Sequence, residues 1–403
     1  MVAFFSNDQM PEPSNNTEQS RVVIDDATNY FPEDTLDYSE PTYICYYSPG
    51  VLTVKNADGS SFLYSSVEYC QVKNGAEPGT KTVIRKSADG GLTWSAVTTV
   101  DGMRWASLFL VGSKIYIVGA KNGGTYLGEV KQDEQVALTK ITIKDETNNT
   151  TGSEQTSANE PLITDDYVFI PLDSGVHTIP RNGDDLDLEN IIRTQNFRNA
   201  LTKDWFQQVT GKKLSAMYTF MALEGNMVQG KDGEFYVIYR IETMPYGDYA
   251  LMLRLSDDFT KLELMGENGK DSLLANFPTT VSRFVIKYDA ELDMYVMISN
   301  WWTVKDVQTH TCRARNVLGL SVSEDLKTWT KIDTLVVDRE MINSECSAWK
   351  HAFQYTDFDF DGDDLVMTSR ETQGFANTFH DGKYFTFYRV SNFRELIRSK
   401  LAA

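Results

Sequence analysis

The chain has 403 residues, 41% of them hydrophobic and 24% charged, an ordinary globular composition that can supply a large core. Its net charge of −19 argues against a nucleic-acid partner, because phosphate binding needs a clustered basic surface. No apolar run approaches the roughly 20 residues that a transmembrane helix requires.

Residues 1–20 are polar and rich in Ser, Asn and Glu, which is typical of a disordered spacer. They lack the basic and apolar regions of an intact signal peptide. Because such spacers follow a removed export signal or lipid anchor, we expect an extracytoplasmic protein: periplasmic, secreted or anchored at the cell surface. One domain is predicted at 21–396, followed by a tail at 397–403 that is in part consistent with a cloning remnant.

Short runs of alternating apolar and polar residues dominate the domain, and Gly, Asp and Asn turns separate them. They predict strands at 112–120, 165–172, 233–241, 293–300 and 382–390. Few segments show helical periodicity over three turns. An antiparallel sandwich, a barrel and a propeller all fit this pattern.

An internal repeat favours the propeller. Residues 318–332 align without a gap on residues 251–265, which places Ser323 on Ser256 and Asp325 on Asp258. A third copy at 83–97 carries one extra glycine. An eroded fourth copy, FYRVSNFREL, lies near the end of the chain.

Each copy ends a unit that begins with a strand and a Gly/Asp turn. We place the units at about 41–103, 104–155, 156–222, 223–276, 277–343 and 344–396. Six units of four short strands predict an all-β, six-bladed β-propeller; five or seven blades are alternatives, because the second and third units are weakly defined. The strand at 21–25 is expected to pair with the last blade and close the ring.

The copy at 83–97 contains a fixed pattern of turn residues, S-x-D-x-G-x-T-W, formed by Ser87, Asp89, Gly91, Thr93 and Trp94. This pattern resembles the Asp-box of sialidases and related propellers. Serine and aspartate can bond the turn backbone, glycine permits a positive φ, and tryptophan can pack between blades. The resemblance implies a place on the outer turns, so we expect no catalytic role for the aspartate.

The chain from about 41 to 396 resembles the sialidase superfamily, in its bacterial exo-sialidase-like branch. Besides the boxes, the resemblance rests on ALEGNMV at 222–228, on 315–329 and on the motif-rich stretch 353–394. It implies carbohydrate chemistry at the axial face of a propeller. The Arg-Ile-Pro motif of true exo-sialidases is absent, because Val22 and Val23 follow Arg21 in the early candidate. A three-arginine cluster therefore cannot be assigned from the sequence.

Candidate catalytic residues lie where the innermost strand of a unit would begin. Glycoside cleavage uses two acids, or a carboxylate beside an activated tyrosine. Glu224 lies at an otherwise apolar strand start, where burial would raise the pKa of a general acid; a turn carboxylate that bonds backbone amides is the alternative. Tyr355 is a candidate nucleophile and Asp357 a candidate acid. Alternatively, both are strand-edge residues whose polar ends lie in solvent. His380 is a candidate acid, base or sugar contact, or a loop histidine bonded to Asp381.

A second set of residues near the blade starts is predicted to bind substrate: Arg104, Trp105, Glu160, Asn226, Arg283, Arg315, Gln354 and Arg370. Arg283, Arg315 and Arg370 come from separate segments of the last two blades, so they can converge on a carboxylate with bidentate geometry. Each can equally form an ion pair between blades. Convergence of two would favour an acidic sugar.

Neither a metal nor a cofactor is expected. The chain has no CxxC pair, which argues against zinc, and Cys45, Cys70, Cys312 and Cys346 permit disulfides or buried thiols alike. The acidic stretch 357–365 leaves calcium as an alternative, but it lacks EF-hand spacing and is typical of a hairpin turn.

Together these features predict an exo-acting glycoside hydrolase that removes a terminal, acidic sugar from a glycan or polysaccharide. A polysaccharide lyase acting on uronic acids, with Tyr355 or His380 as the base, is the first alternative. A non-catalytic, glycan-binding propeller is the second.

Overall fold

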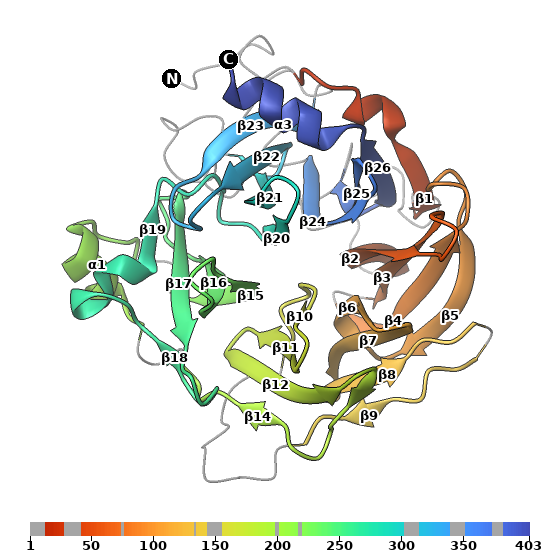
Figure 1. Ribbon diagram of the computed structural model, residues 1–403, viewed down its shortest axis with the longest axis horizontal. Helices are drawn as coiled ribbons and strands as arrows, with labels where there is room; N and C mark the ends of the chain where they lie inside the picture. Colours follow the sequence, from red (N-terminus) through yellow and green to blue (C-terminus); the bar gives the residue numbers. More distant parts are fainter. Residues whose placement is uncertain are drawn as a thin grey trace.

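The computed structural model describes residues 13–27, 42–73, 76–132, 134–142, 155–197, 201–216, 220–301, 314–338, 351–372 and 382–403. These residues form six sheets of four or five strands, arranged as blades around a central axis (Figure 1). The predicted six-bladed β-propeller is confirmed.

Within a blade, neighbouring strands pair antiparallel. The first strand lies nearest the axis in the first five blades, and the strand Ala352–Asp361 does so in the sixth (Figure 1). The first two blades consist of β2 (Thr42–Lys55), β3 (Ser61–Lys73), β4 (Ala76–Ser87) and β5 (Ser95–Asp101), then β6 (Arg104–Val111), β7 (Lys114–Lys121), β8 (Gly124–Glu129) and β9 (Thr139–Lys140).

The third and fourth blades each carry a fifth short strand that pairs with their third. They consist of β10 (Leu162–Ile163), β11 (Tyr167–Leu172), β12 (Gly175–Asn182), β13 (Asp185–Leu186) and β14 (Ile192–Arg193), then β15 (Ala222–Gln229), β16 (Phe235–Ile241), β17 (Tyr249–Leu255), β18 (Leu262–Glu263) and β19 (Leu273–Ala275).

The fifth blade consists of β20 (Val285–Asp289), β21 (Met294–Asn300), β22 (Val317–Ser323) and β23 (Thr330–Val337). The sixth takes β24 (Ala352–Asp361), β25 (Asp364–Thr372) and β26 (Tyr384–Val390) from the end of the chain and β1 (Val22–Asp26) from its beginning. Val22 of β1 lies opposite Phe387 of β26, so the N-terminal strand closes the ring as the sequence predicts.

The hydrophobic core is divided into layers, one between each pair of neighbouring blades. Between the third and fourth blades, for example, Phe169 and Val176 pack with Met227, Val237 and Tyr239. Equivalent clusters fill the other five spaces. Strands buried on both faces explain why several read as nearly continuous apolar runs.

The predicted turn motif lies between the third and fourth strands of the first blade. Asp89 accepts hydrogen bonds from the Thr93 amide and hydroxyl at 2.9 and 2.6 Å, and Ser87 Oγ accepts from the Gly91 amide at 2.9 Å. The Trp94 ring lies 5.6 Å from that of Phe387 in the sixth blade. Gly91, with φ 98°, is needed there, because a Cβ would come within 2.3 Å of Phe387. The tryptophan therefore packs between blades.

The related turns occupy the same place in their blades. In the fifth blade, Asp325 bonds the Lys327 and Thr328 amides, and the Trp329 ring lies 5.6 Å from Phe277. In the fourth blade, Asp258 bonds Ser256, and Leu262 takes the place of the tryptophan. The repeat detected in the sequence is thus a repeat of the outer turn.

Two terminal segments differ from the prediction. Residues 13–20, expected within a disordered spacer, include η2 (Thr17–Ser20) and contact the propeller: Ser14 Oγ donates to Asp333 at 2.6 Å, and Glu18 accepts from the Val337 amide at 2.9 Å. The expected tail belongs to α3 (Phe393–Leu401), because buried Ile397 holds that helix against the last two blades. Residues 1–12 lie outside the described residues.

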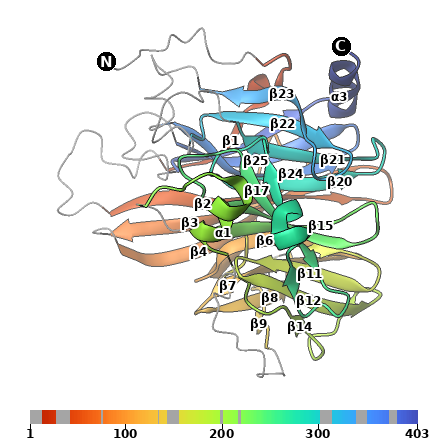
Figure 2. The ribbon, with the colours of Figure 1, turned by 90° about the vertical axis from the view of Figure 1, so that its left-hand side faces the viewer.

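Among the described residues no helix is long and apolar enough to cross a membrane. Cys45 and Cys70 lie directly opposite each other on β2 and β3 as buried thiols without a disulfide. Cys312 and Cys346 lie outside the described residues. Figure 2 shows the blades edge-on, with α1 (Lys203–Thr210) on the rim.

Candidate functional site

Four of the innermost strands contain an irregularity of pairing near their first end. The register shifts after Tyr47 in β2, Arg104 in β6, Leu223 in β15 and Gln354 in β24. In each case the next residue has a positive φ: 37° at Ser48, 48° at Trp105, 54° at Glu224 and 55° at Tyr355. Such a conformation costs about 1–3 kcal/mol for a non-glycine residue, and a β-bulge re-aims a side chain. Its recurrence in four blades marks this end of the axis as a candidate site.

Two of these residues meet across the axis. The Tyr355 hydroxyl of the sixth blade donates a short hydrogen bond to Glu224 Oε1 of the fourth. Burial, together with the adjacent Glu224 carboxylate, raises the pKa of Tyr355 to about 12. The phenol is therefore protonated at neutral pH, and the carboxylate is placed to accept its proton.

Three arginines surround this pair. Arg240 Nε of β16 lies 3.3 Å from Glu224 Oε2, and the guanidinium carbons of Arg315 and Arg370 lie 5.8 and 4.6 Å from the centre of the Tyr355 ring. The Gln354 side-chain oxygen accepts from Arg315 Nη1 at 2.5 Å and from Arg370 Nη2 at 2.9 Å, which holds these two side chains together.

The arginine cluster is buried together with carboxylates: besides Glu224, Glu242 accepts a hydrogen bond from Arg240 Nη2 at 3.4 Å. Burial, aided by Arg240 and Arg370, lowers the pKa of Arg315 to about 9, which still leaves it protonated at neutral pH. Among the described residues, no partner accepts a hydrogen bond from Arg240 Nη1 or Arg370 Nε. Buried guanidinium groups with unused donors fit the carboxylate of a ligand, since bidentate arginine–carboxylate pairs are strong.

Arg283 has a different place from the one predicted. It is wholly buried, and it donates to Asn159 Oδ1 at 2.8 Å, to the Tyr355 carbonyl at 2.6 Å and to the Ala158 carbonyl. These contacts join the third, fifth and sixth blades. Arg283 therefore supports the backbone beneath Tyr355, which agrees with the alternative given for it, a contact between blades.

Asp357 also differs from its predicted role as an acid. One of its oxygens accepts from the Val51 amide of the first blade at 3.0 Å, and the other lies 3.8 Å from Arg283. Among the described residues, Asp357 forms neither a hydrogen bond nor an ion pair with Glu224 or with the phenol of Tyr355. We therefore assign Asp357 to the junction between the last and first blades, where burial raises its pKa.

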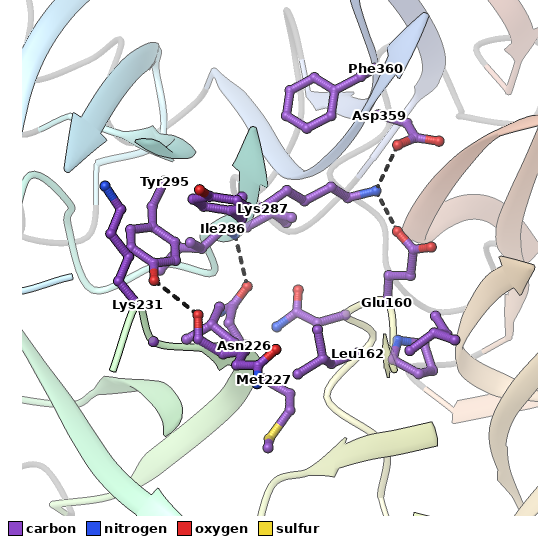
Figure 3. A pocket seen from close by; sticks show the side chains of 18 residues that line it. Glu160, Leu162, Asn226, Met227, Lys231, Ile286, Lys287, Tyr295, Asp359 and Phe360 are labelled. Carbon is purple, nitrogen blue, oxygen red and sulfur yellow. Dashed lines mark hydrogen bonds and ion pairs between the residues drawn. The ribbon is translucent and has the colours of Figure 1, made fainter. Parts of the chain in front are cut away.

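The remaining predicted binding residues lie apart from the tyrosine. Arg104 donates to Glu68 at 2.8 Å and stacks on Trp105, at the same level of the axis but on β6. Asn226 bonds the backbone of the fifth blade, accepting from the Ile286 amide at 3.1 Å. Glu160 pairs with Lys287 and, like Asn226, lines a separate cavity (Figure 3). His380 lies outside the described residues.

The acidic turn at 357–365 forms the predicted hairpin, in which Gly362 has φ 64° between β24 and β25. Its carboxylates pair with cations: Asp361 and Asp364 lie 2.7 and 2.8 Å from Arg389. Within the described ranges, no group of three His, Cys, Asp or Glu residues is placed to hold a metal ion.

Comparison with solved structures identifies the fold. Over 97% of this chain, Trypanosoma rangeli sialidase in complex with 2,3-difluorosialic acid aligns at 12% identity with a TM-score of 0.50, and a mutant of that sialidase displaying trans-sialidase activity aligns with 0.51. A protein of unknown function from Dyadobacter fermentans aligns over 94% of this chain at 10% identity, with 0.52.

The fold is that of the sialidase-type propellers. This chain covers 60–61% of the length of the two sialidase chains and 98% of the Dyadobacter chain. No protein-family model and no curated protein matches the sequence. At these identities the likeness establishes the architecture, and any activity must be argued from this chain's own residues.

Sequence reasoning missed Arg240, which contacts Glu224 directly. A signal was present: Arg240 interrupts the apolar run FYVIYRI of β16, and it lies near the end of the strand that follows the one containing Glu224. A buried arginine in such a run needs a partner from a neighbouring element. The pairing of β15 with β16 places Arg240 opposite Leu223 and so brings it to the glutamate.

Proposed function

We propose that the protein is an exo-acting glycoside hydrolase that removes a terminal acidic sugar from a glycan. The single observation that carries this proposal is the Tyr355–Glu224 hydrogen bond within the ring of Arg240, Arg315 and Arg370. A glycan substrate also agrees with the extracytoplasmic location expected from the sequence.

In this mechanism Tyr355 is the nucleophile and Glu224 is its base. The phenol oxygen attacks the anomeric carbon as its proton passes to the Glu224 carboxylate, and the bond to the leaving oxygen breaks. The leaving oxygen takes up a proton from solvent and departs as an alcohol, and a glycosyl–tyrosine bond remains. Water then attacks the anomeric carbon and gives one proton to solvent, while the proton held by Glu224 returns to the phenol oxygen; two displacements at the same carbon make the enzyme a retaining one.

The arginines explain why a tyrosine would be used instead of a carboxylate. A sugar that bears a carboxylate at or near its anomeric carbon would repel an anionic nucleophile. A neutral phenol avoids this repulsion, and the nearby carboxylate takes its proton only as attack proceeds. Arg240 and Arg370 bind the sugar carboxylate through their unused donors and fix its orientation.

The first test is release of reducing sugar from a panel of sialylated and uronic-acid-bearing glycans. Tyr355→Phe and Glu224→Gln should each lower kcat at least 100-fold, because they remove the nucleophile or its base. Tyr126→Phe, a partly buried tyrosine between the first two blades, is the matched control and should retain full activity. Full activity in Tyr355→Phe would overturn the mechanism.

The same group of residues has the composition needed by a lyase, in which Tyr355 removes a proton next to a uronate carboxylate that the arginines neutralise. A lyase product contains an unsaturated sugar with ultraviolet absorbance, whereas a hydrolase product does not. An absorbance rise on uronate polymers would replace the hydrolase proposal with this second one. Tight binding of acidic glycans without any product would instead favour a non-catalytic propeller.

A further inference from the structure

A cavity lies further along the axis from the tyrosine site. Two pairs of residues from the innermost strands mark two levels of the axis: Glu224 contacts Tyr355 near one end, and Lys287 lies 3.2 Å from Asp359 further on. The cavity, of about 550 Å³, is bounded by the later residues of β15 and β24, by β20 and by the segment that ends in β10 (Figure 3). Such a volume is in the range of small-molecule sites.

The cavity is separate from the tyrosine site. None of Tyr355, Glu224, Arg240, Arg315 and Arg370 lines it. Asn159 lies between the two: its amide donates to the Glu224 and Gly225 carbonyls at 3.1 and 2.9 Å, and its oxygen accepts from Arg283. A ligand in the cavity therefore does not depend on chemistry at Tyr355.

The walls are largely apolar and one end is polar. Leu162, Met227, Ile286 and Phe360 contribute apolar surface (Figure 3). At the polar end the Lys287 ammonium is held between the carboxylates of Glu160 and Asp359. An apolar cavity with a few convergent polar groups is the usual character of a ligand site.

The charges that line the cavity balance. Glu160 and Asp359 are acidic, and Lys231 and Lys287 are basic. An anion would meet the two carboxylates, and a cation would compete with a lysine that is already paired, so neither has a net attraction. An uncharged polyol fits this lining, because its hydroxyls can donate to the carboxylates and accept from the ammonium. Phe360 and Tyr295 supply aromatic surface for the apolar face of a ring.

We propose that this cavity binds an uncharged saccharide of one or two rings, with its hydroxyls on Glu160, Lys287 and Asp359. The site lies beyond the proposed catalytic centre and stands independently of it. Burial raises the pKa of Glu160, and the paired Lys287 ammonium opposes this rise.

The test is saturation-transfer NMR on the full chain with glucose, galactose, mannose, N-acetylglucosamine, lactose and cellobiose, each at millimolar concentration. At least one should bind. Leu162→Trp, which fills the cavity without removing a polar group, should weaken that binding at least tenfold. Leu92→Trp, on an outer turn where Leu92 is 70% exposed, is the matched control and should leave it unchanged. Glu160→Gln should weaken binding while the protein stays folded.

Tyr355→Phe distinguishes this site from the catalytic one, since it should abolish turnover and leave binding of the neutral sugar intact. Glucuronate and glucosamine serve as charged comparators and should bind more weakly in the cavity than the neutral sugar. The proposal is overturned if none of the six neutral sugars binds, if Leu162→Trp leaves binding unchanged, or if a charged comparator binds this cavity more tightly.

Discussion

Tyr355 and Glu224 are 131 positions apart in the sequence, yet their hydrogen bond defines the candidate site. Each was predicted as catalytic because a polar residue begins an otherwise apolar strand. Their partnership could not be read from that pattern, because it depends on two bulges that turn both side chains to one point. The backbone strain at these two residues is consistent with a functional site.

At the residue scale, Arg240 offers a direct test of acidic-sugar binding. Arg240→Lys keeps the charge and loses the planar fork, so we expect KM for an acidic substrate to rise about tenfold with a smaller change in kcat. Initial rates at varied substrate concentration measure both constants. Arg254→Lys, in an exposed ion-pair network of the same blade, should change neither. An unchanged KM in Arg240→Lys would remove that side chain from substrate binding.

Arg283 shows that a buried arginine can have a structural role where the sequence suggests ligand binding. The sequence predicts the same substrate-binding role for Arg283, Arg315 and Arg370, since all three are charged residues near the start of an innermost strand. The structure gives its donors to backbone carbonyls of the third and sixth blades. Burial lowers the pKa of Arg283, and the Asp357 carboxylate 3.8 Å away opposes this shift.

At the scale of the element, the recurring outer turn is the best-determined feature of the chain. Its pattern sets hydrogen bonds within about six residues, so local sequence is sufficient to form it. The tryptophan or leucine that follows packs onto the preceding blade. The turn therefore contributes to the assembly of the ring and lies away from the axis.

The turn aspartates predict a pH dependence of stability. Hydrogen bonds from Thr93 and Ser87 lower the pKa of Asp89 to about 2, and those from Ser256 and Thr260 do the same for Asp258. A carboxyl whose pKa is lower in the folded protein than in the unfolded chain, where it is about 3.8, stabilises the fold at pH values above 3.8. This stabilisation is lost as the pH falls toward 2. Asp89→Asn with Asp258→Asn should therefore lower the melting temperature at pH 6 and have no further effect near pH 2.

Calorimetry across this pH range measures the difference between wild type and the double variant. Asp165→Asn, a carboxyl on an exposed turn of the third blade, is the control substitution and should show no such window. A difference that stays constant from pH 6 to pH 2 would contradict the role given to the two carboxylates.

At the scale of the whole molecule, ring closure depends on one short N-terminal strand. Ile24 of β1 packs against the layer between the sixth and first blades. Ile24→Ala should lower the free energy of unfolding by about 2 kcal/mol and speed amide exchange in β26, the strand that β1 covers. Val23→Ala is the matched control, since Val23 is 40% exposed on the other face of the strand. Equal effects of the two substitutions would argue against closure through this layer.

The blade count and nearly all blade boundaries could be predicted because they depend on local order: turn residues, alternation and a repeat of fixed spacing. The contacts of the terminal segments were missed, because Asp333 and Val337, which hold residues 14–18, lie more than 300 positions away. Nothing in a polar segment of that composition indicates such partners.

What the sequence by itself determined is the scaffold, because periodicity and turn chemistry are short-range properties. Only the tertiary structure decided the function of individual charged residues. Closing six blades into a ring brings the starts of their innermost strands together, and small bulges then choose which side chains face the axis. For this reason Arg240, which the sequence did not single out, contacts Glu224, whereas Arg283 and Glu160, both predicted to bind substrate, lie at a contact between blades and in a separate cavity.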